Sequence, residues 1–177
     1  MKNIFRLFFA LSALTVVASC GNRQPNDKQM VDNESTQEKL MKANKYLVNK
    51  DADIIKGYIK RRNWDMQVSK AGLWYMIYQN GNGAKASLGK TVTLYYKVWL
   101  LDGTLCYSSE ESGAKRFRLG QGGVESGLEE GMLLLKVGDK ARFILPPHLA
   151  YGLVGDGNKI PERAIILYEV ELIKLEN

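Results

Sequence analysis

Histidine and cysteine, which commonly bind metals or serve in nucleophilic catalysis, are scarce here: the 177 residues include one histidine and two cysteines. The single histidine, His148, excludes a metal site with several histidine ligands, and we interpret it as an ordinary loop residue and not as part of a catalytic triad. The glycine-rich run at 120–123 lacks the spacing of a dinucleotide-binding loop and precedes no recognisable βαβ unit. We therefore expect neither a metal nor an organic cofactor.

A surplus of positive charge is missing from the C-terminal part of the chain. The formal net charge is +6, but the basic excess lies in the first 90 residues, and residues 91–177 are slightly acidic. A nucleic-acid interface needs basic and aromatic residues clustered on one face of a folded domain. We see no such cluster and expect no nucleic-acid partner. With 45% hydrophobic and 25% charged residues, the chain has the composition of a globular protein.

The first residues have the pattern of an export signal. A short positive segment precedes an apolar run at 7–18, which is too short to span a bilayer comfortably as a mature helix. The run Val17-Ala18-Ser19-Cys20 then places small residues before a cysteine, and it resembles the lipobox of bacterial lipoproteins. The resemblance implies a lipoprotein signal peptide over 1–19 and an acylated Cys20 that anchors the chain to a lipid bilayer. Ordinary signal cleavage, with Cys20 incidental, is the alternative.

The residue after this cysteine bears on the destination of the protein. Gly21 stands there instead of an aspartate. By resemblance to lipoprotein sorting in Gram-negative bacteria, this favours a lipid-anchored place in the cell envelope, at the outer membrane facing the periplasm. The outer face of a Gram-positive cell is the alternative. Once Cys20 is acylated, Cys106 is the one free thiol left, so we expect no intrachain disulfide.

A polar tether and then a helix are predicted ahead of the domain. Residues 20–34 are polar and have little to bury, which indicates a flexible tether. Ser35 and Glu38 have the spacing of a capping box, and apolar residues follow at helical spacing.

A second helix is predicted to follow the first. Asp51 or Asp53 could cap it, and its end at Lys60-Arg61-Arg62 places positive charge where a helix C-terminus favours it. We therefore expect a helical extension over 35–68 made of two short helices. Isolated helices this short are marginal in water, so they should pack on the domain or on a second copy of the chain, in a homodimer.

From Gly72 onward the apolar residues follow a period of two instead of the helical period. The clearest strand is 91–101, whose alternate side chains face opposite sides, and Asp102-Gly103 after it is a hairpin signal. The expected elements are strands over 73–78, 91–101, 105–108, 141–145 and 165–175, with one short helix over 127–135. Together they indicate an α+β domain over 69–177, in which an antiparallel sheet wraps around the helix.

A series of short motifs runs in order through this domain. The motifs are Gly81-Asn82-Gly83, Gly89-Lys90-Thr91-Val92-Thr93-Leu94-Tyr95-Tyr96, Asp102-Gly103, Phe117-Arg118-Leu119-Gly120, Val124-Glu125-Ser126-Gly127-Leu128-Glu129-Glu130-Gly131, Val137-Gly138-Asp139-Lys140-Ala141, Leu149-Ala150-Tyr151-Gly152, Ile160-Pro161 and Tyr168-Glu169-Val170-Glu171-Leu172. Each is weak alone, but their joint order resembles the FKBP-type peptidyl-prolyl cis-trans isomerases, over about Gly72 to Asn177. The resemblance implies an FKBP-like antiparallel β-sheet wrapped around one short helix, behind the N-terminal helical extension.

The resemblance also implies an apolar cleft between the helix and the concave sheet. By matching position, the residues expected to act in catalysis are Tyr96, Tyr151, Val124 and Glu125. Those expected to bind the substrate are Phe117, Leu128, Ala150, Ile160, Tyr168, Cys106 and Tyr107. For Val124 and Tyr168, a plain role in the core is a serious alternative.

Five of these positions depart from the residues that are usual in the family. Cys106 stands at a usual aromatic, and Tyr107 stands at a usual Asp. Glu125 stands at a usual Ile, whose backbone N–H typically binds the substrate carbonyl. Leu128 replaces the usual Trp of the pocket floor, and Tyr168 replaces the usual Phe.

The implied reaction needs no nucleophile. Rotation about an X–Pro bond costs about 18–20 kcal/mol because resonance holds the amide planar. The family binds the twisted amide better than the planar one, since the twisted amide loses less on entering a dry pocket. The resemblance therefore implies a peptidyl-prolyl cis-trans isomerase that acts on proline-containing polypeptides of the cell envelope and assists the folding of exported proteins. The departures favour an alternative, a non-catalytic peptide-binding or chaperone module on the same fold.

Overall fold

The structure is a computed structural model that describes the backbone of residues 27–177 and the side chains of residues 35–177. The predicted signal peptide, Cys20 and the first part of the predicted tether lie outside the described residues. Residues Leu40–Asn177 form one compact unit. Within residues 27–177, no helix is long and apolar enough to cross a membrane.

The extension is one helix, and the prediction of two short helices was wrong. Helix α1 (Asp27–Arg62) runs without a break, and it begins within the segment that we expected to be a tether. Ser35 therefore lies inside the helix and not at its cap, and Asp51 is an interior residue. The stretch 47–53 contains neither glycine nor proline, so nothing in it ends a helix. The aspartate pattern was a weak signal for a new helix start.

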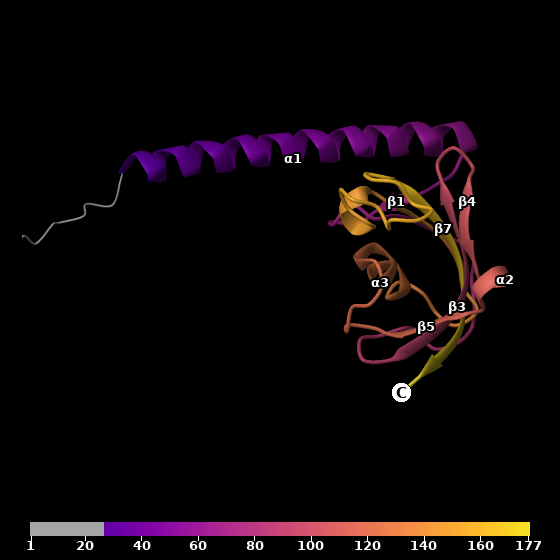
Figure 1. Cartoon of the computed structure of the whole chain (residues 1–177). Helices are drawn as coiled ribbons and strands as arrows, with labels where there is room; N and C mark the ends of the chain where they lie inside the picture. Colours follow the sequence, from indigo (N-terminus) through magenta and orange to yellow (C-terminus); the bar gives the residue numbers. More distant parts are fainter. Residues whose placement is uncertain (1–26) are drawn as a thin grey trace, which may run out of the picture. The chain divides into compact units, whose positions relative to one another are not determined.

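The rest of the chain folds into one antiparallel sheet with three short helices. The strands are β1 (Gln67–Val68), β2 (Trp74–Gln79), β3 (Thr91–Leu100), β4 (Leu105–Ser108), β5 (Lys115–Arg118), β6 (Lys140–Leu145) and β7 (Ile166–Glu176). The helices are α2 (Ser109–Ser112), α3 (Ser126–Met132) and the 3-10 turn η1 (Pro147–Leu149). The strand order is β1-β2-β6-β7-β3-β4, with β5 also paired to β3. Figure 1 shows the sheet curving around α3.

The predicted α+β class and antiparallel sheet are confirmed, and the five predicted strands each appear with ends close to those expected. The central pairing joins β3 to β7, from Thr91 opposite Glu176 to Leu100 opposite Ile166. Four elements were not predicted, namely β1, α2, β5 and η1. β1 and η1 are too short to show a hydrophobic period, and α2 and β5 contain too few apolar residues to show one.

The main core lies between the concave face of the sheet and α3. Alternate residues of β3 and β7 are buried there, as their period-two pattern predicted. Helix α3 can approach β6 closely because Gly131 has no side chain. A Cβ at this position would lie only 2.6 Å from the Phe143 ring. Leu128 and Met132 of α3 are fully buried in this core.

A second apolar cluster lies on the opposite face of the sheet. Ile55 and Tyr58 of α1 are buried against Ile144 of β6 and Leu167 of β7. These strand residues alternate with those of the main core, so they face the other side. The C-terminal turns of α1 thus cover this outer face, and the cluster is completed by Ile59 with Trp64, Met66, Trp74, Trp99, Leu101 and Ile165.

Candidate active site

A cavity of about 250 Å³ opens where β3, β4, β5 and β7 meet the segment that follows η1. Its lining residues are Tyr96, Val98, Tyr107, Lys115, Tyr151, Asp156 and Tyr168. Tyrosine side chains dominate these walls. The cavity therefore offers aromatic surface together with hydroxyl groups.

Four residues predicted from the sequence come together in this cavity: Tyr96, Tyr107, Tyr151 and Tyr168. The other seven predicted residues do not line it. Cys106, Leu128 and Ile160 are buried in the main core, whereas Phe117, Val124 and Ala150 are partly buried against that core. Glu125 is buried and joins the site through Tyr168.

Three lining residues were not predicted, namely Val98, Lys115 and Asp156. Lys115 belongs to β5, where it pairs with Leu94 of β3 and so turns toward the inner face. Its ammonium group lies 5.0 Å from the Tyr96 ring centroid and 5.8 Å from that of Tyr168. Nothing in the sequence indicated that Lys115 faces the cavity, because β5 shows no alternation of apolar and polar residues. Asp156 stands between two glycines, which suggested only a turn.

Tyr96 is fixed from both of its ends. Its backbone N–H donates to Ser109 Oγ at 3.1 Å, and its hydroxyl is 2.8 Å from Ser112 Oγ. Both serines belong to α2, so this short helix holds the ring in place. The ring centroids of Tyr96 and Tyr168 lie 6.4 Å apart at an angle of 46°, and the two rings form adjacent walls of the cavity.

A buried carboxylate adjoins the wall formed by Tyr168. The Tyr168 hydroxyl donates to Glu125 Oε1 at 2.8 Å, and Glu125 is 8% exposed. Burial raises the pKa of Tyr168, and the charge of Glu125 raises it further. The hydroxyl therefore stays protonated and remains a donor. Two of the departures from the family pattern, Glu125 and Tyr168, thus contact each other.

Tyr151 lines the cavity from the segment after η1 and is partly exposed. Burial raises the pKa of its hydroxyl, and the nearby Glu125 carboxylate raises it further. Tyr151 is consequently a neutral hydrogen-bond donor at physiological pH. Such a donor can bind a peptide carbonyl but does not supply a nucleophile.

Tyr107 and Asp156 link β4 to the same segment. The Tyr107 hydroxyl donates to Asp156 Oδ2. Asp156 Oδ1 accepts the backbone N–H groups of Asn158 and Ile160, each at 2.9 Å. Burial raises the pKa of Asp156, but the hydrogen bonds from Tyr107 and the two N–H groups outweigh it and lower the pKa overall. Asp156 is thus a charged anchor for this part of the cavity wall.

Covalent chemistry has little support in the part of the chain that the structure describes. No group of three or more His, Cys, Asp or Glu residues there could hold a metal ion. Burial raises the pKa of the Cys106 thiol, which is the opposite of what a nucleophilic cysteine requires. The site is suited to binding an apolar group beside a polar donor.

The fold is a curved antiparallel sheet around a short helix, and a tyrosine-lined cavity lies at their junction. These features are typical of one class of isomerase. The chain belongs to the family of FKBP-type peptidyl-prolyl cis-trans isomerases, whose sequence profile matches residues 82–173.

Individual relatives show how far the likeness extends. FK506-binding protein 2 of Yarrowia lipolytica is 42% identical over 94 residues, which cover 52% of this chain and 65% of that protein. The FKBP-type peptidyl-prolyl cis-trans isomerase FkpA of Aeromonas hydrophila is 33% identical over 151 residues, covering 85% of this chain and 49% of that protein. The crystal structure of FkpA from Escherichia coli matches with a TM-score of 0.60 at 26% identity, over 87% of this chain and 74% of that one.

These coverages have two consequences. The matched stretches span less than two thirds of either sequence relative's own length. The match to the Aeromonas protein is longer than the domain over 69–177, so it includes part of the extension.

Proposed function

We propose that this chain is a peptidyl-prolyl cis-trans isomerase that acts on proline-containing polypeptides through the tyrosine-lined cavity. The observation that carries the proposal is the meeting of Tyr96, Tyr151 and Tyr168 in one cavity of about 250 Å³. Aromatic walls favour a proline ring, and a neutral hydroxyl at their edge favours a peptide carbonyl. Membership of the isomerase family supports the same reading.

The proposed mechanism is differential binding of the twisted amide. The planar amide is polarised by resonance, so it loses more hydration energy than the twisted amide when it enters an apolar cavity. The barrier of about 18–20 kcal/mol therefore falls without any bond being made or broken. The Tyr151 hydroxyl and the backbone N–H of Glu125 are the groups that we propose fix the peptide carbonyls.

The setting of the reaction is part of the proposal. The lipobox-like Val17-Ala18-Ser19-Cys20 supports a lipid-anchored protein of the cell envelope, and Gly21 after it supports the outer membrane facing the periplasm. Its substrates would then be exported proteins that fold there. The anchor would keep the isomerase close to chains that emerge at the membrane.

The test compares the natural chain with three variants in cis-trans exchange of a proline peptide, followed by NMR. Tyr151→Phe should lower kcat/KM about tenfold, because one hydrogen bond in a dry site is worth about 1.4 kcal/mol. Tyr151→Ala should abolish the activity, since it also opens the cavity to water. Tyr46→Phe is the matched control, because Tyr46 is an exposed tyrosine of α1. Full activity in Tyr151→Ala would show that the cavity is assigned wrongly.

A second candidate function is a non-catalytic peptide-binding or chaperone module. Lys115 and Asp156 line the cavity and Glu125 adjoins it, and such charged groups hold water and weaken discrimination against the planar amide. A natural chain that suppresses aggregation of an unfolded client, yet exchanges the peptide at the background rate, would establish this function instead.

A further inference from the structure

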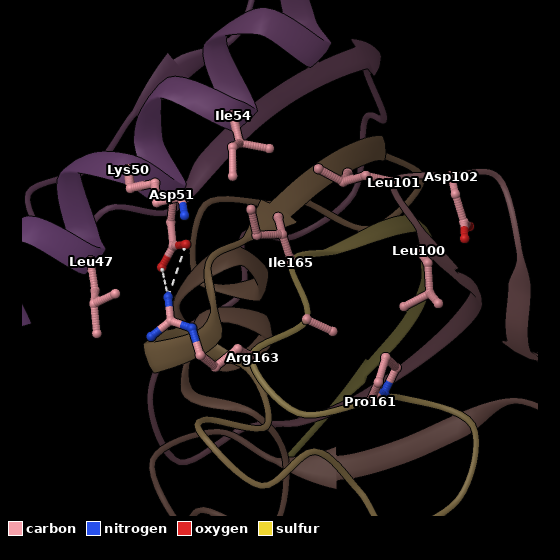
Figure 2. Close-up of a pocket in the computed structure, with 11 residues that line it drawn as sticks. Leu47, Lys50, Asp51, Ile54, Leu100, Leu101, Asp102, Pro161, Arg163 and Ile165 are labelled. Atoms are coloured by element: carbon pink, nitrogen blue, oxygen red, sulfur yellow. Dashed lines mark hydrogen bonds and ion pairs between the residues drawn. The ribbon is translucent and has the colours of Figure 1, made fainter.

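A partly buried ion pair joins α1 to the segment that carries Tyr151 and Asp156. Asp51 of α1 is 7% exposed, and both of its carboxylate oxygens lie 3.1 Å from Nη2 of Arg163. Figure 2 shows the two side chains pointing toward each other, with Leu47 and Ile54 on either side along the helix. A carboxylate is seldom this buried without a partner, so the ion pair is the reason that Asp51 is tolerated here.

Arg163 also closes the active-site segment on itself. Its backbone N–H donates to the Gly152 carbonyl at 3.1 Å, and its φ of 54° is in the left-handed region. Inside the closed segment the backbone is tightly packed, because a Cβ at Gly155 would lie 2.3 Å from the Ile160 carbonyl oxygen. We call residues 152–163 the pocket loop. Arg163, which closes this loop, is also the residue that binds Asp51 of α1.

The pocket loop reaches the cavity at its other side. It contains Asp156, which binds the Tyr107 hydroxyl of β4, and it directly follows Tyr151. The loop is thus held to the sheet at Asp156 and at Lys159, whose carbonyl accepts from the Cys106 thiol at 3.6 Å, and it is held to α1 at Arg163. A movement at one point shifts the wall that carries Tyr151 and Asp156.

The ion pair bridges a place where side-chain packing is incomplete. Two cavities, of about 400 and 470 Å³, are both lined by Asp51 and Arg163. Figure 2 shows the smaller of them, between α1 and the pocket loop near Pro161. Close packing alone therefore does not hold the loop against the helix here. The ion pair spans this gap.

We propose that Asp51 and Arg163 are positioning residues for the isomerase site, through which α1 sets the shape of the pocket loop. The inference rests on the proposed isomerase function and adds to it a role for the extension. Neither residue lines the cavity of the active site. Both act through the loop, so the helix is a working part of the site and not only a spacer.

The test uses the full chain with Asp51→Asn, which keeps the shape of the side chain and removes its charge. Kcat/KM for the proline peptide should fall about fivefold to tenfold, because small displacements of positioning groups lower rates steeply. Hydrogen exchange of the amides in 152–163 should accelerate by about tenfold, with β3 and β7 unchanged. The matched control is Asp53→Asn, since Asp53 lies on the same helix in an exposed pair with Lys56 at 3.2 Å.

A charge swap completes the experiment. Asp51→Arg combined with Arg163→Asp should restore both readouts, since Asp tolerates a positive φ better than most residues. Wild-type behaviour of Asp51→Asn in both readouts would overturn the proposal. Faster hydrogen exchange throughout β3 and β7 in Asp51→Asn would also overturn it, because the ion pair of Asp51 and Arg163 would then serve only the stability of the fold. If the natural chain has no isomerase activity, the proposed function fails, and hydrogen exchange of the loop alone still decides whether α1 positions it.

Discussion

The contact between Glu125 and Tyr168 is an unusual feature at the scale of single residues. A carboxylate in an apolar core is costly unless donors satisfy it. Tyr168 provides one donor, to Oε1, whereas Oε2 has no partner among the described residues. An isoleucine and a phenylalanine at these positions would need no such contact. The two departures from the family pattern therefore make physical sense only as a pair.

This pairing predicts a large coupling in a double-mutant cycle. Tyr168→Phe leaves Glu125 without its donor and should lower the free energy of unfolding by about 1–3 kcal/mol. Glu125→Ile leaves the Tyr168 hydroxyl buried without an acceptor and should also destabilise the fold. Combining the two substitutions should recover about 1 kcal/mol or more relative to their sum. Urea unfolding of the four proteins measures each term.

A surface hydroxyl serves as the control for this cycle. Tyr75 donates to Gln67 Oε1 at the same distance of 2.8 Å, but this bond is exposed. Tyr75→Phe should change the free energy of unfolding by less than about 0.5 kcal/mol, as surface substitutions usually do. Strict additivity of Tyr168→Phe and Glu125→Ile would contradict the pairing.

The contact between Tyr107 and Asp156 predicts a pH dependence. Hydrogen bonds lower the pKa of Asp156 in the folded chain, so its contribution to stability is present above the ordinary aspartate pKa of about 3.9. That contribution is lost as the pH falls through the folded pKa. Tyr107→Phe removes one of these hydrogen bonds, so its stability should fall less than that of the natural chain on acidification.

The measurement is urea unfolding of both proteins at about pH 6 and pH 3. These values lie on either side of the ordinary aspartate pKa of about 3.9. Asp102 and Glu176 also have lowered pKa values, so both proteins should lose stability on acidification. Only the difference between them reports on Asp156. An equal loss in the two proteins would rule out a contribution from the Tyr107 contact.

At the scale of elements, the last turns of α1 complete the fold of the domain. Ile55 is fully buried, and it packs with Tyr58 over Ile144 and Leu167 on the outer face of the sheet. The domain predicted from the sequence, over 69–177, leaves α1 out. The structure shows that this fragment would expose an apolar face that α1 otherwise covers.

We therefore predict that a fragment beginning at Ser69 melts cooperatively but at a lower temperature than the full chain. Each buried aliphatic or aromatic side chain that is lost removes about 1.5–3 kcal/mol, and α1 contributes several. A fragment beginning at Leu40 is the control, because it keeps every α1 residue of this cluster. Differential scanning calorimetry of the three proteins makes the comparison. Equal melting temperatures for the two fragments would show that the outer cluster adds no stability.

The elements differ in how far the sequence could predict them. Strands β3 and β7 are long enough for their alternating pattern to reveal both the strand and its buried face. Strand β5 was missed because Lys115–Arg118 is rich in charge, and only its pairing with β3 makes it a strand. Helix α1 was divided wrongly because Asp51 suggests a cap by itself, whereas its partner Arg163 is remote in sequence.

The residues of the site also differ in how far the sequence could predict them. Matching to the family's positions located the tyrosines at 96, 107, 151 and 168, which all line the cavity, whereas the other seven predicted residues do not. The roles of Lys115 and Asp156 depend on contacts between segments that are distant in sequence. No local pattern encodes such contacts, so these two residues emerged only from the structure.

At the scale of the whole molecule, exposed apolar side chains on α1 predict self-association. Leu40 and Met41 are 59% and 65% exposed, and Tyr46 and Val48 are also exposed. Exposed apolar side chains such as these favour a protein partner, and we propose a second copy of this chain. Leu40→Glu with Met41→Glu should convert a dimer into a monomer in analytical ultracentrifugation. Lys39→Glu is the matched charge control, and a natural chain that sediments as a monomer would contradict the proposal.

The final prediction concerns the anchor of the molecule. The proposed acylation of Cys20 should make the natural chain fractionate with membranes, because each buried methylene of an acyl chain contributes about 0.8 kcal/mol. Cys20→Ser should move the protein to the soluble fraction, while its isomerase activity stays unchanged. Cys106→Ala is the control, since the Cys106 thiol is buried in the domain and its loss should leave fractionation unaltered. Mass spectrometry of the mature N-terminus checks the same point directly. An unmodified Cys20, or a Cys20→Ser protein that remains with the membranes, would show that the chain is held there by something other than this lipid.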